Sequence, residues 1–523
     1  MNETVAQRRC PTCGDIELIR YGKSDNGRQR WRCKTCGRRT TTPTCAHPEP
    51  IFADEIPKKQ IYVVTAAQNA TPVHEGFWTA LQEYCEVRDA ALVVVPMRYK
   101  NPTSLMESQT YVNDFEWWDS KTVPFLFSGR ARLHKKLMLL ADFHINPTAT
   151  RPLSGLDSIT GSASGIVPHT KAEMRTIATP HHEFPKIMVT TGAVTVANYS
   201  QTKAGAKGEF HHVLGAIVVE IDGGIFHLRR INATLGGAFT DLWVKYRPDE
   251  TTCLAPPADA LVIGDTHFGR SDPKVLQATF DGPNSLIAKF HPKHLVWHDL
   301  LDFHSRMHWD EAKPFVNLAK QRAGKDNVLQ EIRDVCAFVE KVDAACKWKP
   351  KHVFPFSNHP DAFARWMDRA DWRQDPVNAE MYLETAFAMA KSTEWNQSGA
   401  NVLDPFVYWA EKLLPPKILE RCLFLGPNDS FSLHDIELGM HGHLGPNGAR
   451  GSLMNLSKLG VKSITGHCHS PGEQDGAMSV GTSSVFFLGY NRGPSSWLQT
   501  HAVLHADGKR QLINIIHGKA WLE

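Results

Sequence analysis

Five short apolar segments in the second half of this 523-residue chain each lead into a cluster of aspartate, asparagine or histidine. The segments are Ala260–Ile263, His294–Trp297, Val353–Phe356, Ile436–Met440 and Val461–Thr465. Apolar runs of this length, bounded by polar residues, are typical of buried strands. Ligands of parallel α/β sheets bind just beyond the carboxyl ends of the strands. The pattern therefore predicts an α/β fold with a polar site assembled from separate segments.

The polar clusters contain the donors of a transition-metal site. The candidate metal ligands are Asp265, His267, Asp299, Asn358, His441, His467 and His469. Mixed carboxylate and imidazole ligands suit Mn, Fe or Zn better than the all-oxygen shells of Ca or Mg. Two divalent cations about 3.5–4 Å apart can neutralise a phosphodiester and activate water. The clusters therefore predict a two-metal phosphoesterase, with Mn as the first choice and Fe or Zn as alternatives.

The order of the clusters resembles the calcineurin-like metallophosphoesterase superfamily over about residues 258–500. The matching motifs are Asp265-Thr266-His267, Asp299-Leu300-Leu301-Asp302, Asn358-His359, His441 and Gly466-His467-Cys468-His469. The resemblance implies a calcineurin-like sandwich in which Asp265, His267 and His469 hold one metal. The other metal would be held by Asn358, His441 and His467. Asp299 would bridge the two ions, and His359 would act on the leaving oxygen as the catalytic residue.

Three positions depart from the family pattern. They are His298 and Ser357, each in place of a glycine, and Pro360 in place of an acidic residue. None of them removes a ligand. Because glycine often occupies positions of positive φ, the turns at His298 and Ser357 must tolerate a side chain if the pattern holds. The missing acidic residue removes a partner that would orient His359. His443 competes with His441 for the lone-histidine position, and His441 is favoured because the predicted strand ends just before it.

Four cysteines near the N-terminus predict a structural zinc site. Cys10 and Cys13 form one Cys-x-x-Cys pair, Cys33 and Cys36 form another, and 19 residues separate the pairs. Four thiolates in this spacing make a closed tetrahedral zinc site, and such a small module folds only with its metal.

The zinc module is also strongly basic. Residues 1–44 carry ten Lys/Arg and four Asp/Glu, whereas the rest of the chain carries 48 Lys/Arg and 51 Asp/Glu. Residues 26–37 resemble the zinc ribbons of insertion-element transposases, which implies DNA contact. The candidate nucleic-acid contacts are Arg28, Arg30, Trp31, Arg32, Lys34, Arg38 and Arg39. The alternative is a ribbon that docks on protein and leaves its charges solvated.

The length predicts two large domains beside the ribbon. We expect a zinc ribbon at 1–44, a linker at 45–59, an α/β domain of unknown role at 60–255 and a metallophosphoesterase domain at 256–523 with a helical insertion at about 361–430. Strand 61–64, helix 75–86 and strand 91–95 form a predicted βαβ unit, and a hairpin spans 213–231. Residues 199–208 are expected to form a solvated loop, with contact of Lys203 and Lys207 to a phosphate backbone as the alternative. This arrangement resembles phage-encoded DNases of the superfamily.

The remaining expectations concern surroundings and partners. The chain has no apolar run of membrane length and no signal core, so we expect neither a membrane span nor secretion. Eleven cysteines fit a reducing cytoplasm, which would be the host cytoplasm for a phage protein. The apolar positions of helix 328–346 predict core packing or a subunit contact, which leaves a homo-oligomer open. Trp366, Trp372, Trp395 and Trp409 are expected to pack helices, with base stacking as the alternative.

Together these features predict a Mn-dependent DNA nuclease whose ribbon positions the substrate. A phosphatase or a cyclic-nucleotide phosphodiesterase is the alternative within enzymes, because the same metal core serves both. A non-catalytic DNA-binding regulatory or assembly protein is the alternative from another class.

Overall fold

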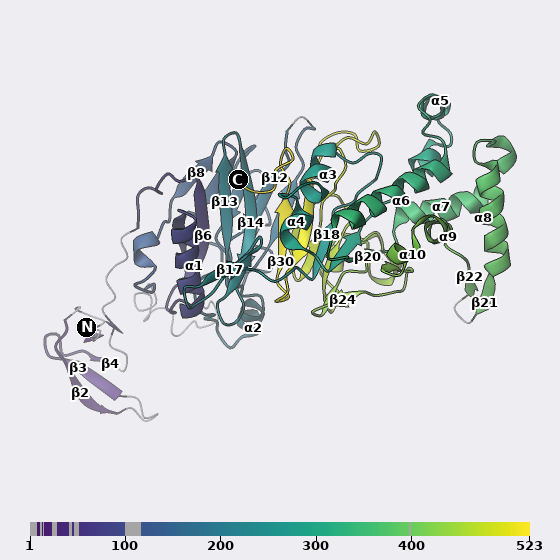
Figure 1. The fold of residues 1–523 in the computed structure, drawn as a ribbon. Coiled ribbons are helices and arrows are strands. Elements are labelled where there is room, and N and C mark those ends of the chain that lie inside the picture. Colours follow the sequence, from purple (N-terminus) through teal and green to yellow (C-terminus); the bar gives the residue numbers. More distant parts are fainter. Residues whose placement is uncertain are drawn as a thin grey trace.

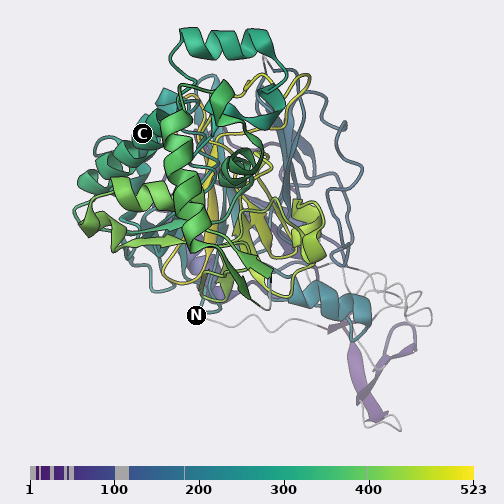
Figure 2. The same cartoon turned by 90° about the vertical axis from the view of Figure 1, so that its right-hand side faces the viewer.

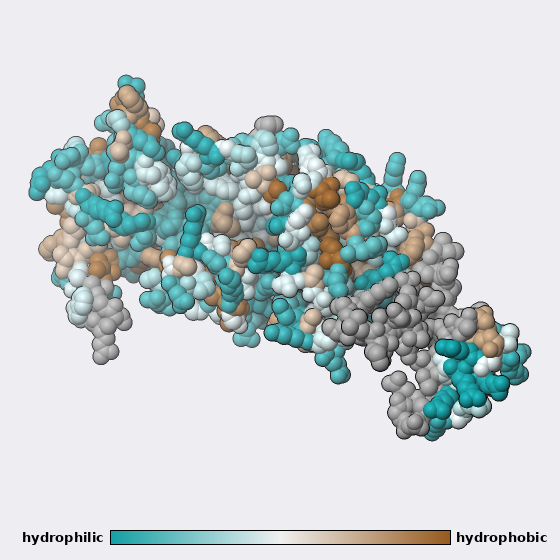
Figure 3. Space-filling model, turned by 180° about the vertical axis from the view of Figure 1, so that it is seen from behind, coloured by the Kyte–Doolittle hydropathy of each residue, from teal (hydrophilic) through white to brown (hydrophobic). Residues whose placement is uncertain are grey.

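The structure is a computed structural model that describes residues 8–10, 13, 15–23, 29–40, 44–45, 52–99, 117–181, 183–396 and 399–522. Over these residues the chain is a mixed α/β protein with two broad layers of sheet and helices outside them (Figure 1). No helix of the described residues has the length and apolar character needed to cross a membrane. Hydrophilic residues cover most of the face drawn in Figure 3, where apolar residues gather in small patches.

The first layer consists of two sheets lying edge to edge. The four-stranded sheet has the order β14-β13-β6-β7, and the six-stranded sheet has the order β23-β20-β19-β18-β29-β30. Their bounds are β6 Ile61–Gln68, β7 Ala91–Met97, β13 Gly215–Asp222, β14 Ile225–Asn232, β18 Ala260–Ile263, β19 His294–Trp297, β20 Lys351–Phe354, β23 Cys422–Phe424, β29 Thr500–Leu504 and β30 Arg510–Asn514. The Asn514 side chain donates to the Leu228 carbonyl oxygen at 3.1 Å, which joins the β30 and β14 edges.

The second layer is one ten-stranded sheet of order β24-β25-β26-β28-β27-β11-β12-β10-β9-β8. Its bounds are β8 Arg130–His134, β9 Leu137–Leu140, β10 Ser164–Val167, β11 Met174–Ile177, β12 Lys186–Thr190, β24 Ser432–Leu433, β25 Ile436–Glu437, β26 Lys462–Thr465, β27 Gly472–Gln474 and β28 Ala477–Ser479. The halves of this sheet join where β11 pairs antiparallel with β27, with Met174 opposite Glu473. A single sheet thus crosses the predicted boundary at residue 256.

Apolar side chains from both layers meet in one core cluster. Val64 and Val219 of the four-stranded sheet, Val262 of the six-stranded sheet and Ile464 of the ten-stranded sheet are all buried in it. Successive side chains of a strand point to opposite faces of its sheet. The continuous apolar runs in this sequence therefore predict sheets that are buried on both faces. The two layers therefore form a sandwich.

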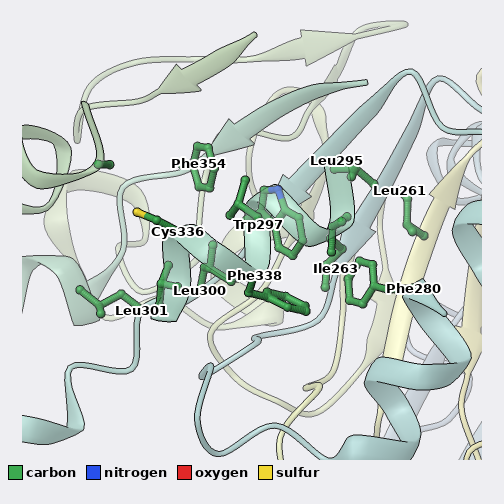
Figure 4. Close-up of a cluster of buried hydrophobic side chains, with 14 of the residues drawn as sticks. Leu261, Ile263, Phe280, Leu295, Trp297, Leu300, Leu301, Cys336, Phe338 and Phe354 are labelled. Carbon is green, nitrogen blue, oxygen red and sulfur yellow. The ribbon is translucent and has the colours of Figure 1, made fainter. Parts of the chain in front are cut away.

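Helices cover the outer face of the first layer. Helix α1 (Glu75–Val87) lies over the four-stranded sheet, and α3 (Pro273–Phe280), α4 (Leu286–Phe290) and α6 (Val328–Ala345) lie over the six-stranded sheet. In the cluster under α6 the ring of Phe280 stacks on Trp297 at 5.5 Å between centroids (Figure 4). Val328, Ile332, Val335, Val339 and Val342 of α6 are buried there, so this helix face is core and not a subunit contact.

A helical segment follows β20 and faces the viewer in Figure 2. It contains α7 (Asn358–Arg369), α8 (Ala379–Ser392), the hairpin β21 (Glu394–Asn396) and β22 (Gly399–Asn401), α9 (Pro405–Leu413) and α10 (Pro416–Leu419). Its helices end earlier than the expected residue 430, because β23 already returns to the sheet at Cys422. Trp366 and Trp409 are buried as expected, whereas Trp395 is 83% exposed.

The shorter elements complete the fold. They are β15 (Phe239–Asp241), β16 (Val244–Tyr246), β17 (Thr252–Leu254), α5 (Pro314–Arg322), α11 (Leu453–Leu456) and, in the ribbon, β1 (Arg8–Arg9), β2 (Leu18–Lys23), β3 (Gln29–Cys33), β4 (Arg39–Thr40) and β5 (Thr44–Cys45). The expectation of a solvated loop at 199–208 is wrong, because helix α2 (Lys203–Phe210) begins inside it. The Thr202 hydroxyl accepts from the Gly205 amide at 3.1 Å and caps that helix.

The strand pairing of the first half of the body recurs in the second half. Parallel β6 and β7, with antiparallel β13 and β14 beyond β6, correspond to β18, β19, β29 and β30. The order β8-β9-β10-β12-β11 corresponds to β24-β25-β26-β28-β27, with the same parallel and antiparallel neighbours. Isolated parallel bridges, Ala66 with Ala193 and Asp265 with Thr482, occupy equivalent places. The body is thus two copies of one strand arrangement.

Candidate metal centre

The candidate ligands stand at strand ends of both layers. Asp265 and His267 follow β18, Asp299 follows β19, and Asn358 begins α7 after β20. His441 follows the short β25, whose end at Glu437 precedes the predicted end at Met440, and His467 and His469 follow β26. The sandwich brings these ends together, so residues more than two hundred positions apart can touch.

One ligand cluster combines Asp265, His267, Asp299 and His469. Their donor atoms all lie within 4.8 Å of one another, and all four residues are buried. His469 Nε2 lies 3.0 Å from His267 Nε2 and 2.9 Å from Asp265 Oδ2. His267 Nδ1 lies 2.9 Å from Asp302 Oδ1, a contact that keeps a proton on Nδ1 and directs the Nε2 lone pair into the cluster.

A second set of donors surrounds Asn358. Its Oδ1 lies 3.2 Å from His441 Nε2 and 3.1 Å from His467 Nδ1. His441 Nε2 is also 3.1 Å from Asp299 Oδ2. Asp299 therefore reaches both sets of donors.

The donors fit divalent cations. Asp299 Oδ1 is buried and has no hydrogen-bond partner among the described residues. A buried carboxylate oxygen that accepts no hydrogen bond is rare, and a bound cation would compensate its charge. Two imidazole nitrogens facing each other beside two carboxylates supply the mixed nitrogen and oxygen set that transition metals prefer. The buried cluster could therefore hold metal ions, whose identity the donors alone do not fix.

The charges of the site also favour cations. Burial raises the pKa of Asp265 and Asp299, but neighbouring histidines, His441 first, lower both pKa values below the usual range. Burial lowers the pKa of His267, yet Asp302 and the other carboxylates raise it to about 8. Carboxylates and protonated imidazoles thus balance one another. Divalent cations would displace those protons.

Backbone strain concentrates at the ligands. The φ angles of His267, Asp299, His467 and His469 are 44°, 40°, 73° and 54°. Side chains other than glycine rarely adopt this left-handed region, and such strain is typical of functional sites. Gly466 precedes His467, and a Cβ there would lie 2.8 Å from His298 Cγ and would also collide with Asp265.

The departures from the family pattern have physical explanations. Asp299, not His298, adopts the positive φ, and Ser357 is extended with φ −138°, so neither position needs glycine. His359 Nδ1 lies 2.5 Å from the Asp302 carbonyl oxygen, which supplies the orienting partner that Pro360 cannot. His359 is buried, with Nε2 3.8 Å from Asp299 Oδ2. His441 Nε2 reaches both Asp299 and Asn358, at 3.1 and 3.2 Å, as the favoured lone-histidine position requires.

Sequence reasoning missed several residues around the ligands. His298 Nδ1 lies 3.2 Å from His441 Nδ1 and braces that ligand. Arg270 Nε lies 3.3 Å from Asp302 Oδ2. The aromatic residues Trp309, Tyr490 and Trp497 also border the site. Of these residues, His298 was the one next to a motif residue. A histidine in place of the usual glycine before Asp299 was the sequence signal that could have identified it.

A cavity of about 270 Å³ lies elsewhere. Phe184, Phe226 and Ile516 are among the residues that line it, together with Lys135 and Lys136. None of the candidate ligands lines it.

The four ribbon cysteines form a separate cluster. Their sulfur atoms lie within 4.8 Å of one another, with Cys10 and Cys36 at 3.5 Å and Cys13 and Cys33 at 3.5 Å. The cluster could hold one metal ion. Arg32, Lys34, Arg38 and Arg39 are exposed, and Arg30 and Trp31 are partly buried, whereas Arg28 lies outside the described residues. The Arg39 guanidinium lies 4.4 Å from the centre of the Tyr21 ring.

The first half of the body lacks these ligands. By the equivalent strand registers, Ala66, Gln68 and Val95 stand where Asp265, His267 and Asp299 stand in the second half. Residues 168–171 of the first half read Pro-His-Thr-Lys in place of Gly-His-Cys-His. His169 remains, but its Nε2 contacts the Asn146 carbonyl oxygen at 3.1 Å. Among the described residues of 52–255, no group of acidic, histidine or cysteine side chains could hold a metal ion.

Comparison with known proteins gives one relative. No family model and no solved structure matches the chain. The chain is 31% identical over 488 residues to Protein A1 of Escherichia phage T5, and the match covers 89% of this chain and 83% of that protein. The chain therefore belongs to the family of phage T5 Protein A1.

Proposed function

We propose that this protein is a two-metal phosphodiesterase of the calcineurin-like type that hydrolyses DNA, with Mn as the preferred metal. The observation that carries the proposal is the position of Asp299. Its Oδ2 lies within reach of both donor sets, 4.0 Å from His267 Nε2 and 3.1 Å from His441 Nε2, while Oδ1 has no hydrogen-bond partner among the described residues. A carboxylate shared by two cations is the geometry that holds a metal pair together.

The surrounding residues have distinct roles in this proposal. Asp265, His267 and His469 would bind one ion, and Asn358, His441 and His467 the other; two bound ions would supply charge neutralisation and activation of water. Asp302 and His298 orient His267 and His441 through the contacts at 2.9 and 3.2 Å. His359, held through Nδ1, presents Nε2 toward the cluster and would give a proton to the leaving oxygen.

DNA as the substrate rests on the ribbon. In its described part, Arg32, Lys34, Arg38 and Arg39 are exposed cations on a module whose cysteines could hold a structural zinc ion. Such a surface attracts a polyanion, and a small phosphate ester would not need it. This feature favours a nuclease over a phosphatase or a cyclic-nucleotide phosphodiesterase.

The test compares substrates and two aspartate variants. Purified protein with Mn is incubated with labelled single- and double-stranded DNA, a small phosphodiester and a cyclic nucleotide, and its metal content is measured. Asp299→Ala should lose both catalytic ions and all hydrolysis, whereas Asp302→Ala should be milder because Asp302 contacts His267 and not the second donor set. Hydrolysis of only the small esters would contradict the DNA assignment. Bound metal without any hydrolysis would support a non-catalytic DNA-binding protein.

A further inference from the structure

Three aromatic side chains form a row beside the metal centre. Trp497 lies 4.1 Å from the His469 ring, and Trp309 lies 6.1 Å from the His359 ring, measured between centroids. Tyr490 lies between them, 5.4 Å from Trp309 and 6.0 Å from Trp497. We call Trp309, Tyr490 and Trp497 the aromatic row. It connects a candidate metal ligand to the candidate catalytic histidine.

Two members of the aromatic row are partly open to solvent. Trp309 is 37% exposed and Tyr490 is 42% exposed, whereas Trp497 is half-buried. Neighbouring rings in the row meet at 56° and 62°, so neither neighbouring pair is stacked face to face. No ring of the row therefore covers the whole face of its neighbour, and the exposed parts of Trp309 and Tyr490 can contact a planar ligand.

The loop that carries Tyr490 is tied to the metal centre. Arg270 contacts Asp302 through Nε at 3.3 Å and donates from Nη1 to the Leu488 carbonyl oxygen at 2.7 Å. The Asn491 side chain accepts from the Leu488 amide at 2.9 Å and donates to the Phe486 carbonyl oxygen at 2.6 Å. Tyr490 is thus held in place before any ligand arrives, which lowers the ordering cost of binding.

Arginines lie near the row. Arg270 is one-third exposed and contacts Leu488, two residues before Tyr490, and Arg365 of α7 is partly exposed and pairs with Asp361. Burial, and then the charges of Arg365 and Arg369, lower the pKa of His308, the neighbour of Trp309. Aromatic faces with flanking arginines are the combination that single-stranded nucleic acid binds.

We propose that the aromatic row stacks an unpaired nucleobase next to the scissile phosphate. The bases of a duplex are already paired and stacked, so the row can accept only a base that has left the helix. The substrate class is therefore single-stranded DNA or an unpaired DNA end, without a fixed sequence, because every base has a stacking face. This inference rests on the proposed nuclease function.

A binding measurement tests the aromatic row independently of catalysis. A single-stranded oligonucleotide carrying 2-aminopurine, which reports stacking by its fluorescence, is titrated into the full chain without added Mn. Trp309→Ala and Tyr490→Ala should each weaken binding by roughly ten-fold and reduce the fluorescence change. Trp309→Phe should retain most of the affinity and of the fluorescence change. Phe487→Ala is the matched control, because Phe487 is 57% exposed on the same loop and its ring lies against His181. Equal binding by all variants would overturn the proposal.

Cleavage of a modified substrate provides the second test. An abasic nucleotide beside the cleavage position should slow the wild-type protein by roughly ten-fold, but should not slow Trp309→Ala further, because the stacking partner is already absent. The same abasic penalty in both proteins would overturn the proposal. If the wild-type protein cleaves no DNA with Mn, the nuclease function fails, while the fluorescence titration still decides whether the row stacks bases.

Discussion

Single residues of the candidate metal centre combine possible ligand chemistry with a strained backbone. The His267 amide donates to the Asp299 carbonyl oxygen at 2.8 Å, so the two left-handed ligands brace each other. The His467 amide likewise donates to Asp265 Oδ2 at 2.8 Å. Strained conformations persist only where the surroundings determine them fully. These contacts therefore fix the ligands before a metal binds.

His359 should separate catalysis from metal binding. His359→Ala is expected to keep both ions and to lose about 10²–10⁴-fold of turnover, the typical contribution of a general acid. Metal analysis beside the rate of DNA cleavage measures both effects. His434→Ala is the control, because His434 pairs with Asp259, which lies outside the candidate ligand set. Loss of a metal ion from His359→Ala would reassign His359 as a ligand.

Metal affinity should depend on pH through His267. Its pKa of about 8 means that the metal-free site holds a proton at neutral pH, which an incoming ion must displace. Affinity for Mn should therefore rise from about pH 6 to about pH 8 and then level off, with proton release visible by calorimetry in buffers of different ionisation enthalpy. Asp302→Asn should move this rise to lower pH, because Asp302 raises the pKa of His267. An affinity that does not change with pH would contradict this account.

The sequence predicted the residues that belong to short motifs and not those that reach the site from loops. Asp265 and His267 lie together in the chain, and the structure brings them beside His469. Tyr490 and Trp309 carry no motif, and they meet only because loops after different strands fold toward each other. A single sequence shows local order but not such long-range proximity.

At the level of elements, the turn after β26 shows why a glycine precedes the paired histidines. Gly466 has no side chain to collide with Asp265 or His298. Gly466→Ala should displace Asp265 and lower occupancy of the metal centre, which metal analysis and a thermal melt would detect. Gly460→Ala is the matched control, since a Cβ there meets nothing within 4 Å. Equal metal content in both variants would show that the turn at Gly466 can accommodate a Cβ without displacing Asp265.

The ribbon should contribute to binding and not to cutting. Deleting residues 1–44 removes ten Lys/Arg and four Asp/Glu but no candidate ligand of the buried centre. Hydrolysis of a small diester should survive, while affinity for duplex DNA falls. The log-log salt slope of that affinity should flatten by about 0.9 for each DNA phosphate that the ribbon no longer neutralises. Unchanged affinity and slope would make the ribbon a purely structural module.

Elements with a local signature were predictable, and those defined by distant partners were not. The apolar spacing of α6 predicted a core helix, and its valines are buried. The ten-stranded sheet escaped prediction because its strands are short and its central pair joins Met174 to Glu473. Pairing register is set by buried faces and partners that the local pattern does not contain.

The whole molecule depends on the shared sheet and core. The second half alone would expose the β27 edge, which pairs with β11, and would lose the core residues Val64 and Val219. Residues 256–523 expressed by themselves should therefore aggregate or lack a cooperative melt, because unpaired edges and bare apolar faces promote association. Size-exclusion chromatography and calorimetry beside the full chain measure this. A soluble, cooperatively folded fragment would show that the halves fold independently.

The repeated strand arrangement, whose described residues place candidate metal donors in only one copy, has a consequence for how a duplex would be attacked. An enzyme with two equivalent centres can cut both strands in one encounter. In the described part of this chain only the second copy has candidate donors, so each chain should make one nick at a time. With supercoiled plasmid as substrate, attack at transiently unpaired bases should make open circles accumulate before linear molecules appear. Cutting of the second strand would then require another encounter or another molecule.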